Sequence, residues 1–252
     1  MTSQTPRVVL LGASNLALGL ELAVDAARAH FGGPVEVLAA LGRGRSYGMR
    51  SRFLVRSLSG IDSCGLWREL ERRPRAPTWF VATDLGNDLA FGARAEVVEA
   101  WVERAIARLR ACGAQGVLTG LPLARLERLS AREFELYKRV LFPFQRMERE
   151  TLLAEARELE RRSLGLAARH GLAHVALEER WYGVDPIHFA RGARPEVWRR
   201  LIAEWGVAPR GLAIASRRSG WLWYESAHVA GLALGRAQPC ARLEDGTTFS
   251  LY

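Results

Sequence analysis

The sequence predicts an α/β protein, a three-layer α/β/α sandwich in which helices cover both faces of a five-stranded parallel sheet. Short apolar runs alternate along the chain with longer stretches whose apolar residues recur at helical spacing. This alternation is typical of consecutive βαβ units, which place helices on both sides of a parallel sheet. The 252 residues provide enough material for a large core,. No apolar run approaches the length of about 18 residues that a membrane-spanning helix needs.

The first two strands are expected at residues 7–11 and 35–41, because both are short apolar runs suited to burial in a parallel sheet,. Residues 16–31 lie between them and carry apolar side chains at helical spacing. The second strand runs into Gly42-Arg43-Gly44, and a helical stretch is expected from there to about Arg56.

The third strand is expected at residues 78–83, where TWFVAT ends at Asp84-Leu85-Gly86-Asn87-Asp88. An amphipathic helix follows at residues 93–111, with its apolar side chains on one face,. The fourth strand covers residues 116–121 and is stopped by Pro122.

A long helical region after Pro122 breaks near Leu141-Phe142-Pro143-Phe144 and resumes through Arg169, where Gly171 supplies a C-cap,. Phe142-Pro143-Phe144 is interpreted either as a lid or acyl-pocket wall, or as a kinked core segment. The fifth strand is expected at residues 173–177, and Pro195 opens a last helix that reaches about Trp205,.

The chain beyond residue 210 has a different composition, rich in Gly, Ser, Trp and Tyr. Asp245-Gly246 lies between short alternating segments and predicts a hairpin,. We therefore expect one domain over residues 1–210 and a β-rich C-terminal extension over residues 211–252 that packs on it.

Charge and cysteine usage limit the partners and the compartment. The net charge is +9, but the basic residues are scattered in runs of three at most, so neither a nucleic acid nor a membrane is expected as a partner,. Cys64, Cys112 and Cys240 form no C-x-x-C pair, which favours a reduced, cytoplasmic protein,. The N-terminal apolar stretch has one basic residue, Arg7, and is interpreted as an internal strand and helix rather than a signal peptide,.

Two serines compete as a nucleophile. Residues 44–48 read GRSYG and fit the G-x-S-x-G elbow of α/β-hydrolases, with Ser46 at its centre,. Ser46 follows only the second predicted strand, however, whereas that nucleophile follows a later, central strand, and no HGGG-like stretch precedes it. Ser14 instead comes directly after the first strand. The carboxyl ends of parallel strands meet at one edge, so Ser14, Gly44 and Asn87 are expected to converge there with the segment 185–188.

Four short blocks in this order resemble those of the GDSL/SGNH hydrolases. They are Gly12-Ala13-Ser14-Asn15, the glycine loop 42–48, Gly86-Asn87-Asp88 and Asp185-Pro186-Ile187-His188, and they span about 70% of the chain. Two positions depart from the family pattern. Ala13 stands where an acidic residue usually precedes the nucleophile, and Leu85 stands at the first position of the usual G-x-N-D.

The resemblance implies a flavodoxin-like SGNH hydrolase fold and hydrolysis of a carboxylic ester with a short acyl group through an acyl-enzyme on Ser14. In that reading His188 is the general base and Asp185 orients it. The oxyanion hole comprises the backbone N–H groups of Ser14 and Gly44 and the side-chain amide of Asn87. The resemblance implies no cofactor and no metal, and a small-molecule or glycan ester as substrate. It equally allows a thioesterase or an acyltransferase, and it leaves the oligomeric state open.

Each block also has a purely structural interpretation. Ser14-Asn15 alone is consistent with a helix cap, Asn87-Asp88 with a turn, and Asp185-Pro186 with a surface loop. His170 and His174 have the spacing of metal ligands, but Gly171 predicts that the helix ends between them. The competing class of function is a non-catalytic, basic glycan- or nucleic-acid-binding protein that uses the aromatic tail around Trp221, Trp223 and Tyr224.

Overall fold

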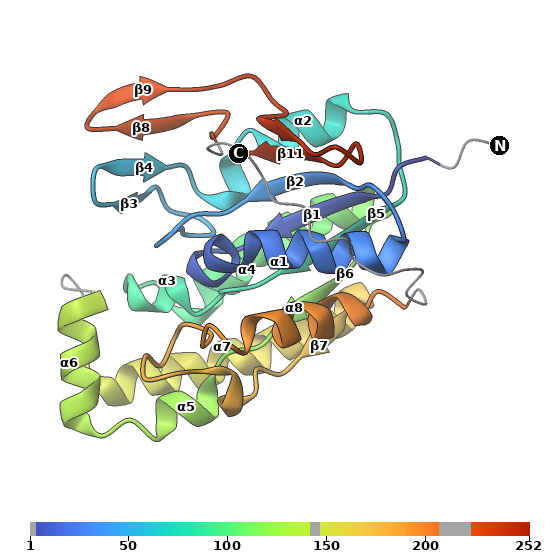
Figure 1. The fold of residues 1–252 in the computed structure, drawn as a ribbon. Coiled ribbons are helices and arrows are strands. Elements are labelled where there is room, and N and C mark those ends of the chain that lie inside the picture. Colours follow the sequence, from blue (N-terminus) through green and yellow to red (C-terminus); the bar gives the residue numbers. More distant parts are fainter. Residues whose placement is uncertain (1–3, 142–146, 207–222) are drawn as a thin grey trace.

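The computed structural model describes residues 4–141, 147–206 and 223–252, and its centre is a mostly parallel sheet (Figure 1). The strands in spatial order are β10 (Ala241–Arg242), β11 (Thr248–Leu251), β2 (Glu36–Ala40), β1 (Arg7–Leu11), β5 (Thr78–Ala82), β6 (Gln115–Thr119) and β7 (Ala173–Val175). The five predicted strands are all parallel. Counted in chain order they are arranged 2-1-3-4-5, the flavodoxin-like order.

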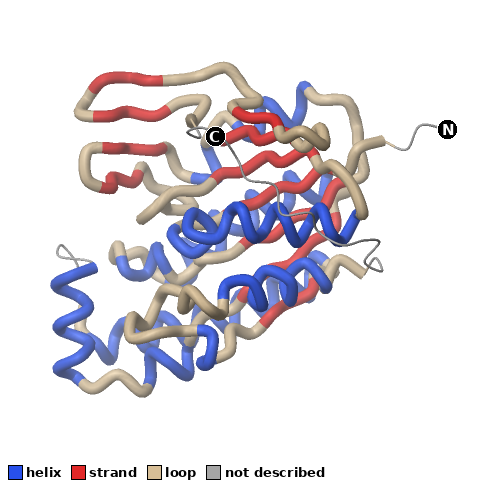
Figure 2. The backbone as a smooth tube through the Cα atoms, viewed as in Figure 1, coloured by secondary structure: helices blue, strands red, loops and turns tan. Residues whose placement is uncertain are grey.

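Helices cover both faces of this sheet and make it the middle of three layers (Figure 2). One layer holds α1 (Ser14–Phe31) and α8 (Arg194–Ala203), and the other holds α2 (Leu66–Arg72), α4 (Ala95–Ala111) and α7 (Arg149–His170). Side chains of a strand alternate between the layers: Val8 and Leu10 pack with α1 and α8, whereas Val9 and Leu11 pack with the other helices,. The predicted sandwich is confirmed.

The layer of α1 and α8 is tight because a glycine lies at the contact. A Cβ atom placed on Gly19 of α1 would lie 2.0 Å from Nε1 of Trp198, which is fully buried on α8. Any larger residue at position 19 therefore has to displace the Trp198 side chain from α8, the helix that follows the segment 185–188.

Shorter helices lie at the carboxyl end of the sheet. They are α3 (Asn87–Ala90), α5 (Leu123–Glu127) and α6 (Ala131–Leu141), with single 3-10 turns at Ile61–Ser63 and Glu179–Trp181. The positive φ of 60° at Gly171 ends α7 as predicted, which puts His170 on the helix and His174 on β7. Phe142-Pro143-Phe144 lies outside the described residues.

The helix predicted from Gly44 to about Arg56 is wrong. This segment contains two short strands, β3 (Ser51–Phe53) and β4 (Arg56–Leu58), joined by a turn in which Leu54 has a φ of 53°. Both belong to a second, antiparallel sheet with β8 (Ala227–Val229) and β9 (Leu232–Leu234). The strand that pairs with β4 is β8, some 170 residues further along the chain, so the local pattern of apolar residues could not predict this pairing,.

The C-terminal residues extend both sheets. Strands β8 and β9 complete the small antiparallel sheet, and β10 and β11 form the expected hairpin, with Asp245-Gly246 in its turn. Strand β11 then pairs in parallel with β2 and gives the main sheet two strands beyond the five predicted. A boundary near residue 210 remains a prediction. Across the three described stretches, no helix combines the length and apolarity needed to cross a bilayer.

Candidate active site

The five residues that the sequence nominates line one open cleft at the carboxyl end of the sheet. Ser14 begins α1 directly after β1, Gly44 follows β2, and Asn87 begins α3 just after β5. Strands β1 and β5 are the neighbours at which the strand order reverses, where α/β sheets form their binding crevices,. Asp185 and His188 come from a longer loop than predicted, ten residues and more beyond the end of β7.

Asp185 and His188 form a hydrogen-bonded pair. The Asp185 carboxylate contacts Nδ1 of the His188 ring, and its Oδ1 also accepts the backbone N–H groups of Ile187 at 2.8 Å and His188 at 3.2 Å. Burial alone would raise the pKa of Asp185, but the hydrogen bonds from His188 and Ile187 outweigh it, and the pKa is lowered,. The carboxylate is therefore charged at neutral pH and holds the proton of the ring on Nδ1, which leaves Nε2 as a base.

Asp84, which sequence reasoning did not assign, caps the start of α1. Its Oδ2 accepts the backbone N–H groups of Ala13 at 2.7 Å, Asn15 at 3.1 Å and Leu16 at 3.3 Å. The N–H of Ser14 is not among them and has no partner within the described part of the chain. An acidic residue is absent at position 13, and a carboxylate from the end of β5 occupies the start of this helix instead.

Asn15 joins the start of α1 to the loop that carries His188. Its Nδ2 donates to Asp84 Oδ1 and to the carbonyl oxygen of Ile187, both at 2.8 Å. Its Oδ1 accepts the backbone N–H of Phe189, again at 2.8 Å. The two residues on either side of His188 are thus bound to the residue that follows Ser14, and this contact brings the two segments together.

Ser46 is buried behind the cleft. Only 1% of its surface is exposed, and its Oγ accepts hydrogen bonds from the backbone N–H groups of Gly48 at 3.1 Å and Met49 at 2.7 Å. Ser46 lines neither the cleft nor the apolar cavity described below. Its contacts are those of a loop-forming residue, as the comparison of the two serines predicts.

The glycine loop keeps its shape through side chains that point inward. Buried Arg45 donates to the carbonyl oxygens of Leu41 and Ser59, and Tyr47 donates its hydroxyl to the Thr83 carbonyl oxygen at 3.0 Å. Gly44 itself has a φ of 66°, the left-handed region that favours glycine,. Its N–H has no partner among the described residues.

The Asn87 amide lies beside this loop. Its Nδ2 donates one hydrogen bond to the Arg45 carbonyl oxygen at 2.8 Å, and its second N–H has no partner among the described residues, while Asn87 itself lines the cleft. The next residue, Asp88, is completely buried and accepts the Tyr47 N–H at 2.9 Å. Burial raises the pKa of Asp88 to about 6, although hydrogen bonds from Ser46 and Tyr47 lower it. Its Oδ1 has no partner in the described structure.

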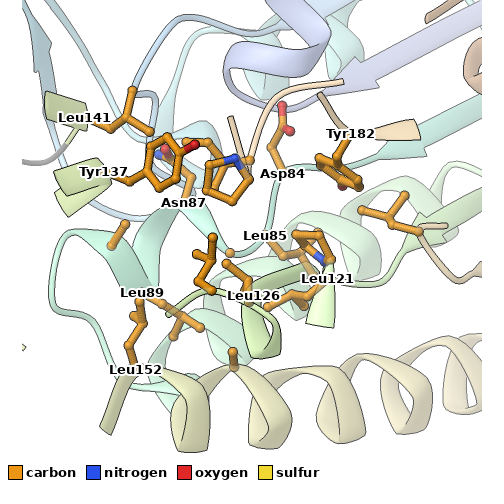
Figure 3. Close-up of a pocket in the computed structure, with 18 of the residues that line it drawn as sticks. Asp84, Leu85, Asn87, Leu89, Leu121, Leu126, Tyr137, Leu141, Leu152 and Tyr182 are labelled. Carbon is orange, nitrogen blue, oxygen red and sulfur yellow. The ribbon is translucent and has the colours of Figure 1, made fainter. Parts of the chain in front are cut away.

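A second, mostly apolar cavity of about 110 Å³ also reaches Ser14. Figure 3 shows Asp84 and Asn87 toward one end of it and the side chains of Leu89, Leu126 and Leu152 toward the other. Ser14 and Asn87 line both this cavity and the cleft, whereas His188 lines only the cleft. Apolar cavities of about 150 Å³ bind molecules as large as benzene, so this one suits a short acyl chain.

The remaining sequence candidates have other surroundings. His174 Nε2 lies 3.0 Å from Ser163 Oγ, and His170 Nε2 lies 3.5 Å from Glu103. Trp223 is exposed, with the Arg236 guanidinium 5.8 Å from its ring centroid. Trp221 lies outside the described residues.

Comparisons with known proteins place the fold. No family model matches the chain, and no curated protein matches it significantly. Solved structures do match. Est24, a carbohydrate acetylesterase from Sinorhizobium meliloti, has a TM-score of 0.55 at 12% identity, over 79% of this chain and 98% of that one. The inhibitor-bound aryl esterase of M. smegmatis has a TM-score of 0.53 at 13% identity, over 78% and 97%. The chain therefore has the fold of GDSL/SGNH-type esterases.

Proposed function

We propose that the protein hydrolyses carboxylic esters through an acyl-enzyme on Ser14. The observation that supports this most directly is the Asn15 side chain, which binds the backbone on both sides of His188 next to Ser14 in one cleft. A serine hydroxyl needs an adjacent base to act as a nucleophile at neutral pH, and His188 with its Asp185 partner is suited to that role.

In the first step Ser14 Oγ attacks the ester carbonyl carbon while His188 Nε2 takes the hydroxyl proton. The carbonyl oxygen becomes an oxyanion, for which the free N–H groups of Ser14 and Gly44 and the second N–H of Asn87 are the donors,. The bond to the alcohol oxygen then breaks, and the alcohol leaves with the proton from His188. Water, deprotonated by His188, attacks the acyl-enzyme and releases the acid and free Ser14.

The two spaces beside Ser14 have different roles in this proposal. The leaving alcohol has to receive its proton from His188, and His188 lines the cleft but not the apolar cavity. The alcohol part of the ester therefore occupies the cleft, and the acyl chain enters the cavity of about 110 Å³. A small-molecule ester with a short, unbranched acyl chain is the substrate class that this division suits.

Hydrolysis of p-nitrophenyl butanoate by wild type, Ser14→Ala and Ser46→Ala tests the proposal. We expect Ser14→Ala to lose at least about 10³-fold in kcat and Ser46→Ala to retain most of it while folded. A fluorophosphonate should label Ser14 in the wild type, as intact mass and peptide mapping will show. Full turnover by Ser14→Ala, or labelling at another serine, would refute the assignment.

A further inference from the structure

The cleft that would hold the alcohol part of the substrate is strongly basic. Three arginines line it: Arg43 next to Gly44, Arg52 on β3 and Arg194 at the start of α8. The only carboxylate among the described lining residues is Asp185, which is already paired with His188. A substrate in this cleft therefore meets three positive charges with a single, occupied counter-charge.

Each of these guanidinium groups is held by one contact that leaves its terminal nitrogens available. Arg194, which is half-buried, donates Nε to the Phe189 carbonyl oxygen at 3.2 Å, and Arg52 donates Nε to the Leu54 carbonyl oxygen at 3.1 Å. The Arg43 guanidinium lies 5.9 Å from the Phe53 ring centroid. None of the three makes an ion pair with any residue in the described ranges.

Arg194 has the most informative position. Its anchor, Phe189, directly follows His188, and all three residues line the cleft, so the Arg194 guanidinium is tied to the segment that carries the proposed proton donor. A planar guanidinium held by Nε presents its two Nη groups to a carboxylate or phosphate, which can bind them with two parallel hydrogen bonds.

Resting on the ester hydrolysis proposed above, we propose that the alcohol part of the natural substrate carries an anionic group, a carboxylate or a phosphate, that Arg43, Arg52 and Arg194 bind. The acyl group is uncharged, because the cavity that receives it is lined mostly by apolar side chains. The two charged residues in its lining have partners of their own: Asp84 binds backbone N–H groups at the start of α1, and Lys138 pairs with Glu135. The protein thus selects esters whose negative charge lies on the alcohol side of the scissile bond.

Matched esters test this selectivity. The probes are p-carboxyphenyl butanoate, its neutral methyl ester and the corresponding p-phosphonooxyphenyl ester, which share the acyl chain and differ only in the para substituent of the phenol that leaves. We expect kcat/KM for at least one anionic probe to exceed that for the neutral probe by about tenfold at low salt. The preference should shrink toward one in about 1 M NaCl, where the Debye length is about 3 Å. The arm with the larger preference tells carboxylate from phosphate.

The triple variant Arg43→Gln/Arg52→Gln/Arg194→Gln should lower the ratio of anionic to neutral kcat/KM about fivefold or more. Arg199→Gln is the matched control, because Arg199 lies on the same helix, also donates Nε to a backbone carbonyl oxygen, at 3.1 Å, and does not line the cleft. Its ratio should equal that of the wild type.

The outcomes separate this inference from the proposed function. Turnover of all probes with a ratio near one in the wild type overturns the inference and leaves the esterase intact, whereas no turnover of any probe overturns both. A preference that persists in the triple variant also overturns the inference. If the triple variant does not fold, the salt dependence of the wild-type ratio decides: a ratio insensitive to salt rejects electrostatic recognition.

Discussion

The backbone N–H of Phe189 donates a hydrogen bond to Asn15 Oδ1 at 2.8 Å. This single contact pairs the residue that follows Ser14 with the residue that follows His188. Asn15 Nδ2 also donates a hydrogen bond to the Ile187 carbonyl oxygen. The Asn15 side chain therefore holds the backbone both before and after His188. The distance between the proposed nucleophile and its base is thus set by a residue that takes no part in the chemistry.

Asn15→Ala should separate the two segments. It leaves the Phe189 N–H and the Ile187 carbonyl oxygen without their partner, and buried groups that lose a hydrogen bond cost about 1–3 kcal/mol each. We expect the free energy of unfolding in urea to fall by about 2–4 kcal/mol and kcat for p-nitrophenyl butanoate to fall more than KM changes. Wild-type stability and kcat in this variant would contradict the role given to Asn15.

Asp88 makes stability depend on pH in an unusual direction. Its folded pKa of about 6 lies above the ordinary value of 3.8, so the folded state favours the protonated carboxyl. The contribution of protonated Asp88 to the free energy of unfolding is therefore full below about pH 4 and is lost as the pH rises through about 6. At ~1.4 kcal/mol per pKa unit, the contribution lost is about 3 kcal/mol.

Asp88→Asn isolates this effect because its amide stays neutral. The difference in free energy of unfolding, wild type minus variant, should decrease by about 3 kcal/mol between about pH 4 and about pH 8 in urea titrations. A difference that stays constant over this range would show that Asp88 titrates normally.

Ala156 offers a way to shorten the apolar cavity that we propose for the acyl chain. It is buried on α7 and lines that cavity. Ala156→Leu should lower the ratio of kcat/KM for butanoate to that for acetate esters by about tenfold, since each excluded CH₂ is worth about 0.8 kcal/mol. Ala168→Leu, at an exposed position of the same helix, should leave the ratio unchanged. An unchanged ratio in folded Ala156→Leu would move the acyl chain out of this cavity.

The main sheet was predictable because its central strands are short apolar runs that end at glycine, proline or polar residues. β1, for example, has all five residues buried and ends at Gly12. The short strands β3 and β4 were not predictable, since the sheet to which they belong is completed by β8, which pairs with β4 from far along the chain. The expected helix there failed because Arg45 and Tyr47 instead bury their side chains against distant backbone carbonyl groups.

The residues of the candidate site were predictable from the sequence where the proposed chemistry requires a particular residue type. They were not predictable where their role depends only on which groups the fold brings close to them. Ser14, Asn87 and His188 stand in recognisable blocks after strands. Asp84 and Asn15 lie within or beside these blocks, but their role depends on which backbone N–H groups come within reach. Ala13 offered an indirect sign: where the usual acid is missing, another carboxylate near the same helix start is expected, and Asp84 directly follows β5.

The placement of β11 next to β2 has a consequence for biosynthesis. The edge of β2 that β11 covers belongs to residues 36–40, whereas β11 is Thr248–Leu251, so some two hundred residues leave the ribosome before the edge is paired. During translation this edge presents unpaired backbone groups that can recruit strands of other chains. Nascent chains truncated before residue 248 should therefore aggregate more readily than the finished protein.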